Sequence, residues 1–298
     1  MNYQGPVIDT HHHLWLREYI SWLQDPAAPH MAGDLFGIRT DYPVEEWMRD
    51  VVPAGVVKSV HVTANWGVEK SLSETKWLQS ISDLHGFPNA IVFQADMTDT
   101  NLESKIKEHL QYPNVRGVRH QIHWDDTAPY RKNVSCADLC NTQEFRRGFD
   151  LLAKEDLHFE LQIFAPQAVH AVELVKAYPE VRFILLHSGM LFDRSASGIG
   201  QWREALALLA SYPNVAVKIS GLVMFSGGIT YLQIRQVIRD CIQIFGVGRT
   251  IFGSNFPLEK LHMSYTDFIT LYRKVLSEYA PQEQRQIFYE NAQTFYRI

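Results

Sequence analysis

The chain has 298 residues, of which 46% are hydrophobic and 20% are charged, and its formal net charge is −5. This length suits one large α/β domain or two ordinary ones, the composition excludes a disordered chain, and the acidic balance argues against nucleic-acid binding. No apolar run reaches the roughly 18 residues of a membrane span, and no apolar run follows basic residues near the N-terminus, so we expect neither a membrane span nor a signal sequence. The three cysteines, Cys136, Cys140 and Cys241, are too few for a disulfide framework. We therefore expect a soluble, cytoplasmic protein that binds neither membranes nor nucleic acids.

Short apolar runs rich in β-branched residues alternate along the chain with segments of helical periodicity. The eight predicted strands are Pro6–His13, Val57–Ala64, Ala90–Met97, Val115–Ile122, His158–Phe164, Arg182–Gly189, Asn214–Leu222 and Thr250–Pro257. The predicted helices between them include Leu72–His85, Leu102–Leu110, Gln143–Glu155, Ala165–Ala177, Trp202–Ser211 and Tyr231–Phe245. Such alternation predicts a parallel sheet with crossover helices, and eight repeats over about 250 residues predict a (β/α)8 TIM barrel. Two closing helices are predicted at Tyr265–Tyr279 and Glu283–Tyr296, and no linker divides the chain, so we expect one barrel domain over residues 1–298.

The first predicted strand delivers a run of three histidines to its carboxyl end, in Val7-Ile8-Asp9-Thr10-His11-His12-His13-Leu14-Trp15. Alternation along a strand puts Asp9, His11 and His13 on one face. Two neutral imidazoles two residues apart on one face can hold one metal ion or one polar substrate group. We therefore expect His11 and His13 to lie in a functional site.

Two long segments, 14–46 and 123–142, each follow a predicted strand. Segments this long inside a compact domain are often lids or binding loops, and in a barrel both would lie at the carboxyl face, where active sites are found. We expect Trp15 and Trp22 from the first segment and Trp124 from the second to wall the pocket.

Polar residues late in barrel strands need an explanation, because the middle layers of a barrel are apolar. Arg119 and Gln121 share the predicted inner face of the fourth strand, where Arg119 would form a fork for a carboxylate. A surface arginine at the strand's end is the alternative. Glu160 and Gln162 are predicted to point inward from the fifth strand, and a core polar pair is as plausible there as a substrate contact.

Three further strands end in polar residues. His187 ends the apolar run Phe183–Leu186 and would be a third histidine at the same barrel face. Asn255 ends the last strand within Gly253-Ser254-Asn255-Phe256-Pro257. Lys218 and Ser220, in the seventh strand, are weaker candidates.

Taken together, the polar residues at these strand ends and their neighbours give the chain a resemblance to the amidohydrolase superfamily. The motifs that carry it are Ile8-Asp9-Thr10-His11-His12-His13-Leu14-Trp15, Glu74-Thr75-Lys76-Trp77-Leu78, Gly117-Val118-Arg119-His120, Leu186-His187-Ser188-Gly189, Lys218-Ile219-Ser220-Gly221-Leu222, Phe252-Gly253-Ser254-Asn255-Phe256-Pro257 and Asn291-Ala292. Each motif alone is weak, but their joint order covers nearly the whole chain. The most similar branch is the amidohydrolase-2 type, which includes sugar-acid lactonases and 2-pyrone-4,6-dicarboxylate hydrolase.

The resemblance implies roles for the strand-end residues. His11, His13 and His187 match the family's histidines and would polarise the substrate carbonyl or hold a metal ion. Arg119 matches the arginine that binds an anionic substrate in related lactonases, and we expect Gln162, Trp15 and Trp124 to contact the substrate as well. The cofactor alternatives are a weakly bound divalent metal ion such as Zn²⁺ and no metal ion at all.

One position departs from the family pattern: Asn255 stands where the family usually has the aspartate that serves as general base. An amide cannot accept a proton at neutral pH. Three explanations compete: a histidine acts as the base; another carboxylate, such as Glu259 or Asp9, acts instead; or the protein binds a ligand with little turnover. In each case Asn255 would orient water or substrate.

The expected function is therefore the opening of a small anionic lactone, of the sugar-acid or dicarboxylate type, by attack of water. The partner is that small anionic substrate, and a homo-oligomer is compatible with this interpretation. The alternatives are a metal-dependent decarboxylase or C–N hydrolase on the same scaffold, and a ligand-binding protein with weak turnover. The fold alone does not decide among them, since this barrel hosts many chemistries.

Overall fold

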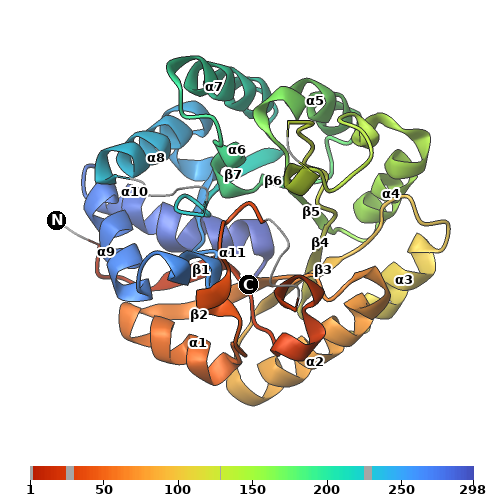
Figure 1. Cartoon of the computed structure of the whole chain (residues 1–298), viewed down its shortest axis with the longest axis horizontal. Helices are drawn as coiled ribbons and strands as arrows, with labels where there is room; N and C mark the ends of the chain where they lie inside the picture. The colour runs from red at the N-terminus through yellow and green to blue at the C-terminus, as the bar shows by residue number, and fades with distance from the viewer. Residues whose placement is uncertain (1–2, 25–29, 128, 225–229) are drawn as a thin grey trace.

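The computed structural model describes residues 3–24, 30–127, 129–224 and 230–298. Eight strands pair in parallel and in chain order. The backbone N–H of Asn255 donates to the His11 carbonyl over 2.6 Å, and a parallel bridge joins His12 to Phe256, so the last strand meets the first. The sheet is a nearly closed barrel inside a ring of helices, which confirms the predicted (β/α)8 architecture (Figure 1). The strands are β1 (Val7–His12), β2 (Val56–Val62), β3 (Ala90–Gln94), β4 (Val115–Arg119), β5 (His158–Leu161), β6 (Phe183–Leu185), β7 (Val215–Ile219) and β8 (Thr250–Phe252).

Most of the helices follow the strands around the outside of the barrel, whereas α6 and α11 lie inside their ring (Figure 1). They are α1 (Val44–Val51), α2 (Ser71–His85), α3 (Leu102–His109), α4 (Gln143–Lys154), α5 (Ala168–Ala177), α6 (His187–Met190), α7 (Ala196–Ala210), α8 (Tyr231–Phe245), α9 (Tyr265–Leu276), α10 (Pro281–Arg285) and α11 (Asn291–Tyr296). The hydroxyls of four residues accept hydrogen bonds from the first turns of α4, α7, α8 and α9, which fixes where these helices begin: Thr142, Ser195, Thr230 and Ser264.

The first long segment is less irregular than predicted. It contains the short 3-10 turns η1 (Arg17–Tyr19), η2 (Ser21–Leu23) and η3 (Phe36–Ile38), and its end is already the helix α1. Val44, Trp47 and Val51 are buried on one face of α1 at helical spacing. The second segment contains η6 (Pro129–Arg131) and η7 (Leu139–Asn141).

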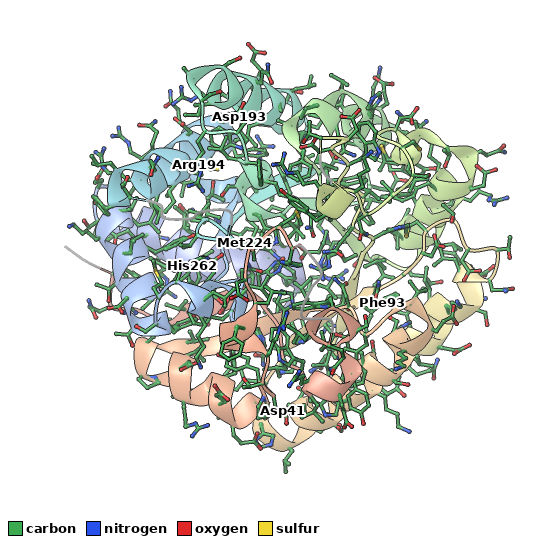
Figure 2. All side chains as sticks on the ribbon, in the orientation of Figure 1. Asp41, Phe93, Asp193, Arg194, Met224 and His262 are labelled. Carbon is green, nitrogen blue, oxygen red and sulfur yellow. The ribbon has the colours of Figure 1, made fainter. Side chains whose placement is uncertain are left out.

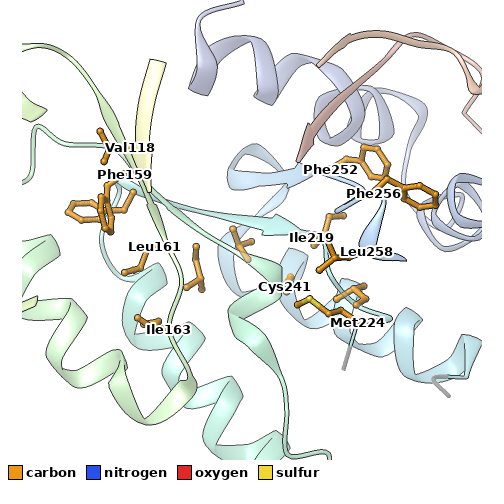
Figure 3. Close-up of a cluster of buried hydrophobic side chains, with 14 of the residues drawn as sticks. Val118, Phe159, Leu161, Ile163, Ile219, Met224, Cys241, Phe252, Phe256 and Leu258 are labelled. Atoms are coloured by element: carbon orange, nitrogen blue, oxygen red, sulfur yellow. The ribbon is translucent and has the colours of Figure 1, made fainter. Parts of the chain in front are cut away.

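Two apolar layers hold the barrel. One fills its interior and includes Ile8, Val60, Val92, Ile184, Ala216 and Ile251. The other lies between strands and helices, where Phe159 and Leu161 point outward from β5 (Figure 3). Tyr296, on α11, belongs to the interior cluster. Because apolar side chains fill the lower barrel, the polar residues that follow the strands gather towards its carboxyl end.

Strand β1 contains the one departure from the predicted side-chain alternation that matters for the site. Its register against β2 shifts between Asp9 and His12. The Asp9 carboxylate accepts hydrogen bonds from the Tyr265 hydroxyl of α9 and from the Ser254 N–H, over 3.1 and 2.8 Å. The prediction that Asp9 shares a face with His11 and His13 is therefore wrong, because the irregularity changes the phase of the strand and leaves Asp9 paired with the outer helix.

Among the described residues, no helix is long and apolar enough to cross a membrane.

Candidate active site

A cavity of about 210 Å³ lies at the carboxyl end of the barrel. Its walls come from the residues that follow the strands and from the two long segments. They are His13, Trp22, His30, Met31, Thr63, Ala64, Asn65, Arg119, Gln121, His123, Tyr130, Lys132, Asn133, Gln162, His187, Met224, Asn255 and Leu258. Met224 lies near the centre of the ring in Figure 2. Five predicted site residues, His13, Arg119, Gln162, His187 and Asn255, are thus brought together in one cavity.

His13 has its tautomer fixed by a backbone contact. Its Nδ1 lies 2.7 Å from the Val62 carbonyl oxygen, which can only accept, so Nδ1 carries the proton and Nε2 keeps a lone pair. Burial, followed by the nearby Arg119 guanidinium, lowers the pKa of His13 to about 3. A hydrogen bond with the Asn255 side chain acts in the opposite direction and raises this pKa. His13 is therefore a neutral imidazole with one proton-accepting nitrogen.

His187 lies in an unusual backbone turn at the end of β6. His187, Ser188 and Met190 all have positive φ, between 51° and 53°, which non-glycine residues adopt rarely. The turn is anchored by the Trp202 indole, which donates to the Ser188 carbonyl over 2.7 Å. The Nδ1 of His187 lies 3.0 Å from the Ser220 hydroxyl, and burial lowers the pKa of His187 well below its usual value. Strain of this kind persists where the surroundings impose it, and it often accompanies function.

Asn255 also has a left-handed backbone, with φ of 67°. Its amide nitrogen lies 3.3 Å from a carboxylate oxygen of Glu259, and that carboxylate also accepts from the backbone N–H groups of Val223 and Met224. Burial raises the pKa of Glu259 to about 8. Glu259 does not line the cavity, so it holds the Asn255 amide from behind.

Arg119 begins a chain of directed hydrogen bonds along the cavity wall. Its guanidinium donates to the Thr63 carbonyl and to the Asn65 side-chain oxygen. The Asn65 amide donates to Gln121 over 2.9 Å, and Gln121 donates to Gln162 over 3.2 Å. Burial lowers the pKa of Arg119 to about 10, which leaves it charged at neutral pH. Gln121 was predicted from its inward spacing with Arg119, whereas Asn65 follows β2 in a segment without a motif and was not predicted.

The described residues of the cavity wall are cationic or neutral. Arg119 and Lys132 line it, and no described aspartate or glutamate does. Cations without balancing carboxylates favour an anionic ligand. The amides of Asn65, Gln121 and Gln162 add groups that hydrogen-bond to hydroxyl or carbonyl oxygens.

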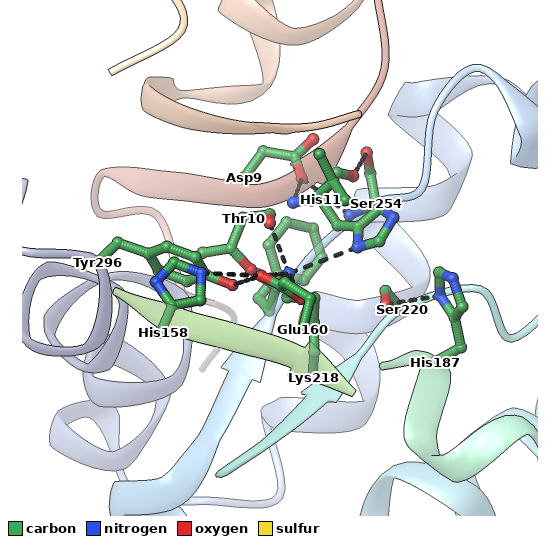
Figure 4. Close-up of polar contacts among 12 residues, drawn as sticks. Asp9, Thr10, His11, His158, Glu160, His187, Lys218, Ser220, Ser254 and Tyr296 are labelled. Carbon is green, nitrogen blue, oxygen red and sulfur yellow. Dashed lines mark hydrogen bonds and ion pairs between the residues drawn. The ribbon is translucent and has the colours of Figure 1, made fainter. Parts of the chain in front are cut away.

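His11 lies just behind the cavity wall. Its ring centroid is 5.1 Å from that of His13 and 4.7 Å from that of His187, so the three imidazoles converge as predicted. Its Nδ1 lies 3.4 Å from the Nζ of Lys218, which contacts both carboxylate oxygens of Glu160 over 2.9 Å (Figure 4). The Tyr296 hydroxyl donates to the same carboxylate over 2.7 Å.

Burial lowers the pKa of Lys218, and the Glu160 carboxylate opposes that shift. Burial acts to raise the pKa of Glu160, but the Lys218 charge, the His158 imidazole and the Tyr296 hydroxyl together outweigh it and hold this pKa below its usual value. Glu160, for which the sequence left a substrate contact and a core polar pair open, is one half of a buried ion pair in the barrel interior. Of the two weaker sequence candidates, Lys218 contacts His11 and Ser220 contacts His187.

Two predicted tryptophan contacts are not found at the cavity. Trp15 is fully buried, donates to the Thr40 carbonyl over 2.8 Å and packs against His13, so it supports the wall without lining it. Trp124 lines a second cavity of about 630 Å³, together with Asp193 and Arg194 near α7 (Figure 2). Trp124 does not line the first cavity, although its ring lies 5.3 Å from the ammonium of Lys132, which does. Trp22 does line it.

The predicted metal site receives no support from the geometry. Within the parts of the chain that the structure describes, no group of three or more histidine, cysteine, aspartate or glutamate side chains could hold one metal ion. The three imidazoles are close, but Asn255 supplies no carboxylate beside them. The assignment of His11, His13 and His187 as metal ligands stays a prediction.

Comparison with known proteins assigns the chain to a family. The family described as Amidohydrolase matches residues 8–298. A protein of Sinorhizobium fredii named "Uncharacterized protein y4mH" is 38% identical over 98% of both chains. An L-fucono-1,5-lactonase of Burkholderia ambifaria is 23% identical over 98% of this chain and 95% of its own.

Solved structures agree on the fold. An amidohydrolase from Burkholderia multivorans with bound zinc superposes with a TM-score of 0.84 at 23% identity, over 99% of this chain and all of that one. A probable 2-pyrone-4,6-dicarboxylic acid hydrolase from Acinetobacter baumannii with citric acid bound gives a TM-score of 0.76 at 16% identity, over all of both chains. With the family match over nearly its whole length and lactonases among its relatives, the chain is a hydrolase that belongs to the amidohydrolase family.

Proposed function

We propose that this hydrolase opens a small lactone bearing a carboxylate, by attack of water on the ring ester. The observation that carries the proposal is the single cavity in which the neutral imidazoles of His13 and His187 lie beside Arg119. The relatives named as lactonases support the same reaction class.

The substrate carboxylate would bind to Arg119, whose Nε has no hydrogen-bond partner in the described structure. The amide groups of Gln121 and Gln162 would then bind hydroxyl or carbonyl oxygens on the ring. A carboxylate on Arg119 offsets the guanidinium charge that helps to lower the pKa of His13. Substrate binding therefore raises the basicity of His13 when it is needed.

His13 takes the proton from the attacking water at Nε2, because Nδ1 is already protonated. The Asn255 side chain, which hydrogen-bonds to His13, stabilises the imidazolium that forms. When the tetrahedral intermediate collapses, the ring C–O bond breaks and the His13 imidazolium returns its proton to the leaving alkoxide. If Ser220 donates to Nδ1 of His187, the other nitrogen of His187 carries a proton that polarises the ester carbonyl. A base with a pKa of about 3 is weak, which suits an activated ester better than an amide.

The proposed reaction needs no metal ion, in line with the absence of a ready ligand set among the described residues. A zinc-bound relative of the same fold makes added zinc a necessary arm of the test.

The test measures the hydrolysis of a panel of neutral and carboxylated lactones, with proton release as the readout. Each lactone is assayed once with a chelator and once with added zinc. We expect carboxylated lactones to be opened with at least tenfold higher kcat/KM than neutral ones. His13→Gln should lower turnover about 100-fold or more, and His262→Gln, at an exposed position outside the cavity wall (Figure 2), should not. No opening of any lactone, or an unchanged rate in His13→Gln, would refute the proposal.

A second experiment tests the missing carboxylate. Asn255→Asp restores the residue type that the family resemblance leads us to expect there. If a lost base limits the natural chain, this variant should bind zinc more tightly and hydrolyse lactones faster. A variant that neither binds zinc more tightly nor hydrolyses lactones faster would refute the explanation that a base has been lost at this position.

A further inference from the structure

We propose that the buried Lys218–Glu160 ion pair is a positioning device that fixes His11 as its Nε2–H tautomer and thereby bars His11 from binding a metal ion. The inference deepens the proposed function, because it assigns His11 the part of a hydrogen-bond donor beside His13, the proton acceptor. It rests on contacts that join three distant parts of the chain.

The first step is the chemistry of the Lys218 contact. Its ammonium lies 2.9 Å from the Thr10 carbonyl, 2.9 Å from each oxygen of Glu160 and 3.4 Å from Nδ1 of His11. An ammonium has donors only and cannot accept a hydrogen bond. The lone pair of His11 must therefore face Lys218, because an N–H at Nδ1 would point at a positive charge.

The second step concerns the other ring nitrogen. A neutral imidazole with its lone pair on Nδ1 carries its proton on Nε2. The Nε2 of His11 is buried and has no hydrogen-bond partner within the described structure. Figure 4 shows it on the ring edge opposite Lys218. This nitrogen is thus a donor without an acceptor, next to the rings of His13 and His187.

The third step compares His11 with His13. A histidine that ligates a metal ion through Nε2 usually donates its Nδ1–H to a carboxylate or a backbone carbonyl. His13 has this arrangement with the Val62 carbonyl. His11 has the reverse arrangement, because its Nδ1 faces a cation. The two histidines, two residues apart at the end of β1, therefore have opposite hydrogen-bonding roles, and the pair cannot bind one metal ion without breaking the Lys218 contact.

The experiment replaces the ion pair as a unit, since removing one partner would leave a buried charge alone. In the full chain with ¹⁵N-labelled histidine, long-range ¹H–¹⁵N spectra report the tautomer of each ring, and His11→Gln identifies the His11 signals. We expect the wild-type His11 signals to show the proton on Nε2. The double variant Lys218→Met, Glu160→Gln should lose this preference, and Ser220→Ala, which alters the partner of His187, should leave it intact.

Calorimetric titration with zinc alone gives the second readout, with at least tenfold tighter binding expected in the double variant than in the wild type. A proton on Nδ1 of His11 in the wild type, or equal zinc affinity in both proteins, would overturn the inference. If the double variant does not fold, the wild-type spectrum still decides. Neither readout requires turnover, so failure here is separable from failure of the proposed lactone hydrolysis.

Discussion

The buried Glu259 carboxyl makes a specific prediction about how stability depends on pH. The pKa of Glu259 is about 8 in the folded protein, and the ordinary value is 4.5. At a pH between these two pKa values, the carboxyl of the folded state keeps its proton and that of the unfolded state loses it. The free energy of unfolding therefore falls as pH rises, by about 1.4 kcal/mol per pH unit from this group alone. Between pH 5 and pH 8 the loss amounts to about 4 kcal/mol.

Glu259→Gln removes the ionisation and keeps an oxygen for the Val223 and Met224 N–H groups. Any lost hydrogen bond costs the same at every pH, so the pH dependence of the difference isolates the carboxyl group. We expect the variant to gain stability relative to the wild type steadily from pH 5 to pH 8, measured by urea unfolding at each pH. The matched control is Glu278→Gln, at a carboxyl whose pKa the Arg235 side chain lowers. Its difference from the wild type should stay constant over this range.

A constant difference between wild type and Glu259→Gln from pH 5 to pH 8 would refute the reasoning. It would mean that the carboxyl is solvated or ionised in the folded protein. The Asn255 amide would then donate to a charged carboxylate, and Glu259 would not be a protonated acid at neutral pH.

Three further predictions concern the cavity. His187→Ala should lower turnover by two to four orders of magnitude if its imidazole polarises the substrate, and an unchanged kcat would remove it from the mechanism. Gly221→Ala would place a Cβ 2.5 Å from Nδ1 of His187 and should lower kcat at least tenfold. Gly246→Ala, at a similar left-handed φ with no heavy atom within 4 Å, should cost about 1 kcal/mol in thermal unfolding and leave kcat unchanged. Arg119→Gln should raise KM at least tenfold for carboxylated lactones and little for neutral ones, and an equal rise for both would contradict the assigned anion contact.

Side-chain alternation identified the inward-facing polar residues of two strands correctly. Arg119 points inward at the end of β4, and Gln121 points inward just after it. Glu160 points inward from β5, and Gln162 points inward just after that strand. The same rule failed at Asp9, because alternation holds only while the register of a strand is regular, and the pairing of β1 with β2 shifts there. No property of the Asp9 segment by itself reveals that shift.

The tryptophans show a different limit. Trp15 and Trp124 were placed at the pocket because each follows a strand within a long segment. The path of such a segment depends on what it packs against. Trp15 is buried against His13, and Trp124 faces the second cavity. Periodicity carries no information about such paths.

The sequence by itself determined the barrel, its eight strands and the histidines at their ends, because side-chain periodicity and strand–helix alternation are local properties of the chain. Only the tertiary structure decided what each imidazole can do. The hydrogen-bonding roles of His11 and His13 depend on a lysine from β7 and a carbonyl from β2. Such contacts join residues far apart in the chain, and the register and packing of the whole barrel set their distances.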